Sequence, residues 1–215
     1  MLHTNKVVEK NIAKTYYTFM KKIIGECQIE KTAKFDGYNL IENSKIGKNC
    51  YIFSSKLKNC VLEDDIIVLN SVLEDCEIKN QTKIGPFCYI RNNAKIGKNC
   101  RIGDFVEVKN SVIKDKTKAS HHAYIGDAFV GENCNIGCGV IFANYNGKIK
   151  QKIYVGNNCF IGANVTLVAP LKIENDCFIG AGTTIRKDLT PKTFVVDITN
   201  NKHKKITWFS NLKIR

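Results

Sequence analysis

Aliphatic side chains return at every sixth position along most of this chain. A period of six fits neither an amphipathic helix nor a simple alternating strand. It is typical of a solenoid in which each hexapeptide supplies one short strand and one corner. The longest run consists of Ile66, Val72, Ile78, Ile84, Ile90, Ile96, Ile102 and Val108. Further runs comprise Leu40, Ile46 and Ile52, then Val130, Ile136 and Phe142, and finally Val155, Ile161, Leu167, Ile173, Ile179 and Ile185.

The repeat predicts an all-β fold, a parallel β-helix that occupies residues 36–190. Three hexapeptides make one coil, so residues eighteen positions apart should stack, with successive coils roughly 4.8 Å apart. About seven coils fit between Leu40 and Asp188 at this spacing. The repeat aliphatics fill the interior of such a coil stack, so a binding site has to be built on its outside.

The two ends of the chain do not follow the repeat. Apolar residues between Asn5 and Ile24 recur at three- and four-residue spacing, which predicts a short α-helix within an N-terminal segment, residues 1–35. Such a helix would cap the strand edges of the first coil or contact another protein. Pro191 ends the regular pattern, so residues 191–215 are expected to form an irregular C-terminal tail.

The repeat is interrupted twice, over Ser111–Tyr124 and over Asn144–Tyr154, and functional residues are expected at both places. The second interruption carries Asn-Gly at positions 146–147, which is typical of the tip of a projecting loop. Three lysines of this loop are expected to reach a neighbouring subunit: Lys148, Lys150 and Lys152.

Small residues occupy one predicted corner in three coils beside this loop. They belong to the triplets Ile136-Gly137-Cys138, Ile161-Gly162-Ala163 and Ile179-Gly180-Ala181. Small side chains at one corner would leave a shallow groove with accessible backbone, suited to a long, thin ligand. The alternative interpretation is that tight corners simply require glycine and alanine.

Two cations are predicted to stack on one outer face. Arg91 and Lys109 are eighteen residues apart, and each follows a repeat aliphatic residue. Like charges one coil apart repel each other unless an anion lies between them. The pair is therefore a candidate phosphate clamp, and a screened surface pair is the alternative.

The first interruption contains adjacent histidines, His121 and His122. A loop histidine can act as a general base near neutral pH, or it can be a solvated residue without a chemical role. A metal site would need a third ligand, and the other two histidines, His3 and His203, lie outside the coils. We therefore expect no metal.

Charge and hydropathy limit the classes of partner. The formal net charge of +13 favours anionic partners, but the lysines are spread along the chain, and the aromatic residues lack the pattern that single-stranded nucleic acid requires. No apolar run is long enough to cross a membrane, and the first residues lack the apolar core of a secretion signal. We expect a cytoplasmic protein that binds neither nucleic acid nor membranes.

Most of the ten cysteines follow the repeat. Seven of them fall four residues after a repeat aliphatic, in a slot that small residues fill elsewhere. In that slot cysteine serves as a small hydrophobic residue, and no pair has zinc-finger spacing. These seven are Cys50, Cys76, Cys88, Cys100, Cys134, Cys159 and Cys177.

Several motifs resemble one family, in order and at matching spacing. The chain between Ile66 and Thr190 is similar to the acetyltransferase domain of the bifunctional bacterial enzyme that makes UDP-N-acetylglucosamine. The resemblance implies a left-handed β-helix, a homotrimer with active sites between subunits, and acetyl transfer from acetyl-CoA to the amine of glucosamine 1-phosphate. The matching motifs are IGPFCYIR from Ile84, DFVEVK from Asp104, SHHAYIGDA from Ser120, NCNIGCG from Asn133, ANYNG from Ala143, LVAP from Leu167 and AGTTI from Ala181.

The same resemblance implies roles for individual residues. It makes His121 the general base, and it makes Arg91 and Lys109 the residues that hold the sugar phosphate. Tyr124 and Asn135 would contact the sugar, and Lys150 would reach the site from the loop. The residues implied in binding acetyl-CoA are Asn144 and Tyr145, at the acetyl group, and Cys138, Ala163 and Ala181, along the coenzyme groove.

The sequence also departs from the family pattern. An arginine expected near Ile198 to hold the coenzyme is missing, and Lys202 is its candidate replacement. These residues contain no Gly-rich nucleotide-binding stretch, so we expect no uridylyl transfer from them. Two alternatives remain: another phosphorylated or nucleotide-linked amino sugar as the acceptor, or a non-catalytic scaffold that partners a separate pyrophosphorylase.

Overall fold

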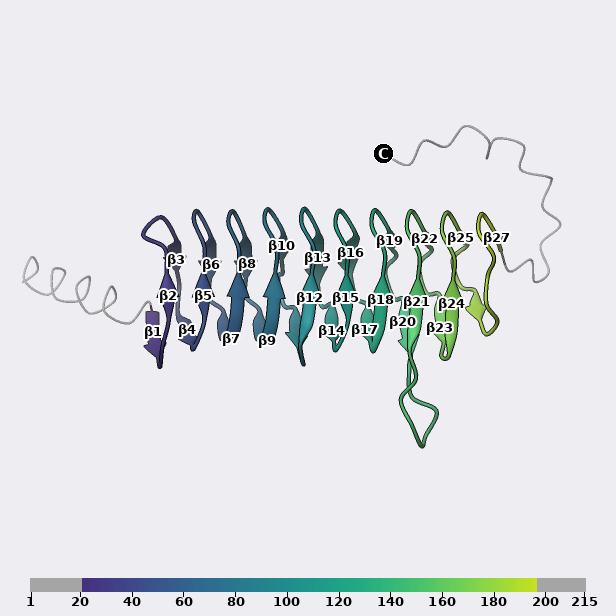
Figure 1. Ribbon diagram of the computed structural model, residues 1–215, viewed down its shortest axis with the longest axis horizontal. Coiled ribbons are helices and arrows are strands. Elements are labelled where there is room, and N and C mark those ends of the chain that lie inside the picture. The colour runs from purple at the N-terminus through teal and green to yellow at the C-terminus, as the bar shows by residue number, and fades with distance from the viewer. Residues whose placement is uncertain (1–20, 197–215) are drawn as a thin grey trace, which may run out of the picture.

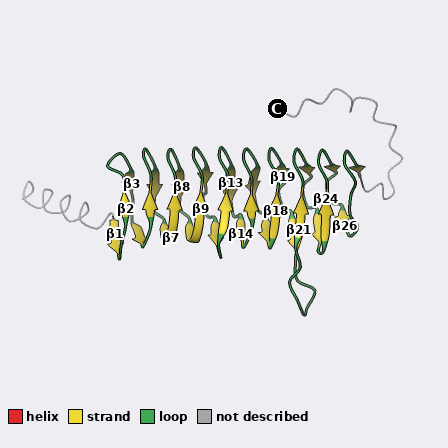
Figure 2. Ribbon diagram, viewed as in Figure 1, coloured by secondary structure: helices red, strands yellow, loops and turns green. Residues whose placement is uncertain are grey.

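The computed structural model describes residues 21–196, and the predicted N-terminal helix and C-terminal tail lie mostly outside them. The described chain forms a left-handed parallel β-helix, in which strands alternate with short turns (Figures 1 and 2). Each coil adds one strand to a 10-stranded sheet, so there are ten coils. At a strand spacing of about 4.8 Å, the stack is roughly 50 Å long. The all-β prediction is confirmed.

Each full coil has three faces, and every strand pairs in parallel with a strand of an adjacent coil. Face one comprises β1 (Lys21–Ile24), β4 (Asn39–Glu42), the first halves of β7 (Lys56–Leu62) and β9 (Val72–Ile78), β11 (Tyr89–Arg91), β14 (Glu107–Lys109), β17 (Tyr124–Gly126), β20 (Ile141–Ala143), β23 (Thr166–Val168) and β26 (Thr184–Ile185). Face two comprises β2 (Gln28–Ile29), β5 (Lys45–Ile46), the second halves of β7 and β9, β12 (Ala94–Ile96), β15 (Val112–Ile113), β18 (Ala128–Val130), β21 (Ile153–Val155) and β24 (Leu171–Ile173).

Face three is the 10-stranded sheet. It comprises β3 (Lys34–Asp36), β6 (Tyr51–Phe53), β8 (Ile67–Leu69), β10 (Lys83–Ile84), β13 (Arg101–Asp104), β16 (Lys118–His121), β19 (Asn135–Ile136), β22 (Phe160–Ile161), β25 (Phe178–Ile179) and β27 (Phe194–Val195). Because side chains alternate along a strand, residues of each strand point alternately into the stack and out of it.

The solenoid begins earlier and ends later than the repeat predicted. Lys21–Ile24, the predicted end of the N-terminal helix, instead forms β1, which pairs with β4. At the other end β27, Phe194–Val195, still pairs with β25 beyond Pro191. The estimate of seven coils was too low, since β3 and β27 belong to coils outside Leu40–Asp188. Several coils also contain fewer than eighteen residues: Leu57 pairs with Leu73, sixteen positions later.

The shorter coils also displace the repeat in the N-terminal half. Leu40 and Val72, counted as repeat aliphatics, are only half-buried, whereas their neighbours Ile41 and Leu73 are fully buried. From Ile78 onward the repeat aliphatics are in the core as predicted. The seven cysteines assigned to the inward slot are all buried, and all ten cysteines are free thiols.

Residues with positive φ mark the corners. Asn59, Asp75, Asn110 and Asp127 adopt this left-handed conformation at the corner between faces one and two. Asparagine and aspartate tolerate it better than other non-glycine residues because their short polar side chains can bond locally. The Asn59 amide donates to the Asp75 carboxylate one coil on, at 2.8 Å, so the corner residues also tie adjacent coils together.

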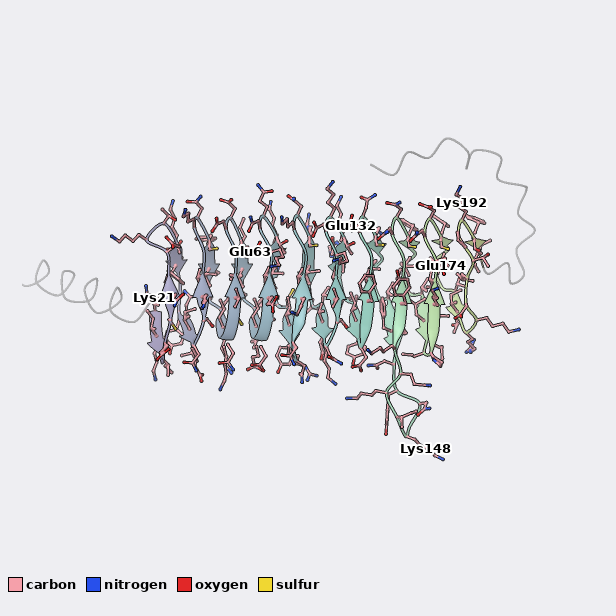
Figure 3. The ribbon with its side chains drawn as sticks, in the orientation of Figure 1. Lys21, Glu63, Glu132, Lys148, Glu174 and Lys192 are labelled. Atoms are coloured by element: carbon pink, nitrogen blue, oxygen red, sulfur yellow. The ribbon has the colours of Figure 1, made fainter. Side chains whose placement is uncertain are left out.

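The two predicted interruptions differ in the structure. Over Ser111–Tyr124 the chain stays in the coil, and Val108 pairs with Ile125 only seventeen positions later. The buried Ser111 hydroxyl at this shortened corner donates to the Lys109 carbonyl, at 2.8 Å. The second interruption is a projecting loop between β20 and β21, as predicted, and Lys148 lies at its tip (Figure 3).

Candidate functional site

The predicted base and groove residues lie in one column along the corner between faces three and one, here called the histidine corner. Asp104 of β13 pairs with His121 of β16. The registers of β16 with β19, β19 with β22 and β22 with β25 continue this column through the next three coils. The histidine corner therefore consists of Asp104, His121, Cys138, Ala163 and Ala181.

His121 is accessible and oriented. Its side chain is 53 % exposed, and its Nδ1 lies 3.2 Å from the Asp104 Oδ2. A backbone hydrogen bond of Asp104 and the His121 side chain lower the pKa of this carboxyl group. With Nδ1 held by the carboxylate, Nε2 is the nitrogen that can accept a proton from a bound group.

His122 has a different environment from its neighbour. It occupies a corner position with φ of 41°, and its ring packs on the ring of Phe105, with centroids 4.8 Å apart. Phe105 in turn stacks on Phe87 one coil before, at 5.3 Å. His122 therefore belongs to an aromatic stack, and only His121 carries the carboxylate contact.

The backbone of the histidine corner agrees with the predicted groove of small residues. A Cβ on Gly137 would lie 2.7 Å from the Ala163 nitrogen, and one on Gly162 would lie 2.5 Å from the Ala181 nitrogen. The coils thus approach too closely for any side chain at these glycines. The next residue in each coil is small, and Cys138, unlike most of the cysteines, is exposed.

The two predicted phosphate-binding cations stack as expected, because Arg91 of β11 pairs with Lys109 of β14. Their environments are unequal. Arg91 donates from Nε and from an Nη atom to the same Glu107 oxygen, at 3.0 and 2.7 Å, and its guanidinium lies 5.0 Å from the Tyr89 ring centroid. Within the chain, Glu107 compensates Arg91, so the stacked pair is less repulsive than its spacing suggested.

A third cation of the site, Lys150, comes from the loop. Lys150 lies beside Lys109 of the same chain, and this neighbouring ammonium group lowers the pKa of Lys150. Asp127 and Tyr124 are close enough to oppose the shift. The structure thus gathers two lysines and one carboxylate at the corner between faces one and two, here called the loop corner (Lys109, Asn110, Asp127, Asn144 and Lys150).

Asp127 holds the loop corner together. This buried carboxylate accepts from the Asn110 amide through Oδ1 and from the Asn144 amide through Oδ2. Its backbone nitrogen donates to the Lys109 carbonyl at 3.0 Å. Asp127 therefore ties the strand end that carries Lys109 to the first residue of the projecting loop.

The remaining predicted site residues surround these two corners. The Asn144 amide, 3.4 Å from the Tyr124 hydroxyl, lies over Gly126, where a Cβ would collide with both. Tyr145 is exposed and donates to the Gly147 carbonyl within the loop, at 2.7 Å. Asn135 points outward from face three, in register with Lys118.

Asn144 has its hydrogen-bond partners within the chain. It is buried, and its amide is directed at Asp127 and Tyr124. Within one chain it positions Tyr124, and its place beside the acetyl group stays a prediction.

The residues that the sequence reasoning missed are the three carboxylates Asp104, Glu107 and Asp127. Two of them had a signal in the numbering. Asp104 and Asp127 both lie seventeen positions from a polar partner, His121 and Asn110, which is the length of a shortened coil. Among the described residues, no three His, Cys, Asp or Glu side chains cluster as a metal site.

Two family models match the chain. One, described as the GMPPB C-terminal domain, matches residues 72–146, and the other, the bacterial transferase hexapeptide with six repeats, matches residues 152–187. The chain is therefore a hexapeptide-repeat β-helix, and the two matched ranges contain every residue of both corners except Lys150.

Relatives in sequence identify the family within the hexapeptide-repeat proteins. Bifunctional protein GlmU of Clostridium kluyveri is 50 % identical over 129 residues, which are 60 % of this chain and 28 % of that protein. GlmU of Clostridium botulinum is 46 % identical over 159 residues, 74 % of this chain and 35 % of that protein. The resemblance to the acetyltransferase domain of the bifunctional enzyme is thus confirmed, although the chain spans about a third of the length of these curated relatives.

Solved structures confirm the fold. UDP-N-acetylglucosamine acyltransferase from Campylobacter jejuni superposes with a TM-score of 0.59 at 15 % identity, covering 80 % of this chain and 70 % of that chain. The enzyme of the same name from Moraxella catarrhalis gives 0.56 at 15 % identity, covering 81 % and 68 %. Residues 21–196 contain no helix long and apolar enough to span a membrane.

Proposed function

We propose that this chain is a cytoplasmic, homotrimeric N-acetyltransferase that moves an acetyl group from acetyl-CoA to the amine of glucosamine 1-phosphate. One observation carries the proposal. A histidine held by a carboxylate lies in the same column as a small-residue groove, and two lysines lie at the other edge of face one. Face one is only the length of one short strand from the histidine corner to the loop corner. The histidine and the two lysines can therefore contact one small acceptor. The likeness to GlmU supports the same reaction.

In the proposed mechanism, His121 is the general base. Its Nε2 takes a proton from the attacking ammonium group, and Asp104 stabilises the imidazolium that forms. The freed amine attacks the thioester carbonyl, an amide bond forms, and the thiolate of coenzyme A leaves and is protonated. No covalent enzyme intermediate and no metal are needed.

The other residues bind and orient the two substrates. Lys109 and Lys150 hold the sugar phosphate as point charges, and Arg91 adds to the field although Glu107 already engages it. Tyr124 and Asn135 face the sugar. The coenzyme lies along Cys138, Ala163 and Ala181, where small side chains leave room for its extended arm, and Tyr145 borders the acetyl group.

The proposal places the complete site between subunits of the trimer. The two corners of one chain flank face one, Tyr145 of the loop is exposed, and the loop carries Lys148 away from its own coils (Figure 3). A neighbouring subunit that packs beside face one would close the site over the acceptor.

An acetyl-CoA turnover assay tests the function. The acceptors are glucosamine 1-phosphate, glucosamine 6-phosphate, glucosamine and a UDP-linked amino sugar. Glucosamine 1-phosphate should give the highest kcat/KM. A higher value for another acceptor would replace the substrate, and the absence of transfer to any of them would leave the scaffold that partners a separate pyrophosphorylase.

A thiol-labelling assay tests the coenzyme groove independently of turnover. Burial raises the pKa of Cys88 and of Cys100 to about 11, so these thiols should react slowly, and the exposed Cys138 should react fast. Acetyl-CoA, which has no free thiol to consume the reagent, should slow the labelling of Cys138 roughly tenfold at ten times its Kd. The Cys138→Ala variant identifies the reacting thiol, and unchanged labelling with acetyl-CoA present would rule out this groove.

A further inference from the structure

Face three carries an uninterrupted row of cations on its outer surface. Lys83 of β10 pairs with Arg101 of β13, and Arg101 pairs with Lys118 of β16. All three residues are exposed, and each occupies the first position of its strand. Their side chains therefore project side by side from three successive coils, and we call them the cation ladder.

The ladder lacks the charge compensation that several other outward cations of the coil stack have. Those cations have a carboxylate of an adjacent coil within ion-pair distance. Lys83, Arg101 and Lys118 have no ion pair and no side-chain hydrogen bond among residues 21–196. The paired residues are Lys56 with Glu74, Lys58 with Glu42, Lys79 with Glu63, Lys95 with Glu77 and Arg91 with Glu107.

One carboxylate lies near the ladder. Asp104 ends the strand that Arg101 begins, and Arg101 is the smallest of the influences that lower the pKa of Asp104. Asp104 is already bonded to His121. The ladder therefore has no carboxylate of its own, and like charges directly opposite one another in a sheet are destabilising.

The residues before and after the ladder in the register limit its length. Ile67 of β8 precedes Lys83 in the register, and Asn135 of β19 follows Lys118. Three cations at strand spacing span about 10 Å. A ligand that relieves their repulsion must carry several anionic groups within that length, and two or three linked phosphates do so. Arginine binds such oxygens through a fork and the lysines bind them as point charges.

We propose that the cation ladder binds an oligophosphate, a group of two or more linked phosphates that is either free or carried by a nucleotide. This site is separate from Lys109 and Lys150, which lie at the far edge of face one. It ends beside Asn135 and on the strand that terminates in His121, so a bound ligand would lie next to the histidine corner. The inference does not depend on the acetyltransferase proposal.

Calorimetric titration at constant ionic strength tests the site. The probes are tripolyphosphate, uridine 5′-diphosphate and orthophosphate. The ladder variant is Lys83→Gln/Arg101→Gln/Lys118→Gln. The control, Lys31→Gln/Lys187→Gln/Lys192→Gln, removes the same charge from exposed turns and bends elsewhere. Circular dichroism checks that both variants are folded.

Wild type should bind tripolyphosphate, the nucleotide or both at least about tenfold more tightly than orthophosphate. The ladder variant should lose roughly tenfold or more of that affinity, and the control should lose less than about twofold. Whichever probe depends on the ladder identifies the source of the oligophosphate. Equal losses of affinity in both variants would show that only the overall positive charge matters, and would overturn the proposal. So would orthophosphate binding as tightly as the oligophosphates, or no binding of any probe.

Discussion

The two corners that flank face one are built in opposite ways. At the histidine corner the chain never leaves the coil, and Asp104, His121, Cys138 and Ala163 are placed by strand register alone. At the loop corner the chain leaves the coil after β20, and buried side-chain hydrogen bonds to Asp127 fix the exit. Regular coils thus position the proposed base and groove, whereas the projecting loop positions Lys150.

This difference has a consequence for what each corner can tolerate. Backbone hydrogen bonds between coils hold the histidine corner, so a side-chain substitution there should change chemistry and leave the geometry intact. The loop corner depends on two asparagine amides and one carboxylate. Substitutions there should change position and charge together.

The largest expected effect is that of His121→Ala at the histidine corner. Loss of the general base should lower turnover by a factor of roughly 10² to 10⁴, with the fold and assembly unchanged. The measurement is steady-state kcat with saturating acetyl-CoA. His122→Ala is the matched control because His122 packs on Phe105 and lacks the carboxylate, and similar losses in both variants would refute the assignment.

A smaller effect is expected for Asp104→Asn. The carboxylate orients His121 through one exposed contact, so its loss should lower kcat by only roughly two- to tenfold. The KM values for both substrates should hardly change, because Asp104 acts through His121. Glu107→Gln on face one is the control and should leave kcat in place. An unchanged kcat in Asp104→Asn would show that Asp104 has no positioning role.

The smallest effect concerns the loop corner and is a change of pKa. Since Lys109 lowers the pKa of Lys150, Lys109→Ala should raise it toward its ordinary value, with Asp127 left as a favourable neighbour. Nuclear magnetic resonance titration of the lysine side chain measures this. Lys95→Ala, which removes a lysine paired with Glu77, should leave Lys150 unchanged. If Lys109→Ala also leaves it unchanged, the two ammonium groups are not neighbours.

The sequence predicted what depends on coil register. The period of six placed the interior from Ile78 onward, and the eighteen-residue spacing placed Arg91 beside Lys109. The small-residue triplets were correctly assigned to one corner, because strand pairing between coils leaves little freedom at these positions. The coil count was wrong because coils continue beyond both ends of the recognised repeat. Sixteen- and seventeen-residue coils also shift the repeat without an obvious break in hydropathy.

What the sequence did not predict depends on side-chain direction. Register alone cannot show that Arg91 turns toward Glu107, or that Lys150 folds back to Lys109 of its own chain. Asp127 was missed because a corner aspartate is the common occupant of a left-handed position, and only its two asparagine partners distinguish it.

The proposed acceptor site predicts that Lys109 acts through the phosphate of the acceptor. The decisive measurement is kcat/KM for glucosamine 1-phosphate and for glucosamine, in wild type and in Lys109→Ala. The substitution should cost about 1.5–3 kcal/mol with the phosphorylated acceptor, the range for hydrogen bonds to charged groups, and close to nothing with glucosamine. The KM for acetyl-CoA should hardly change. Equal penalties with both acceptors would show that Lys109 is structural, and would contradict a phosphate-binding site at the loop corner.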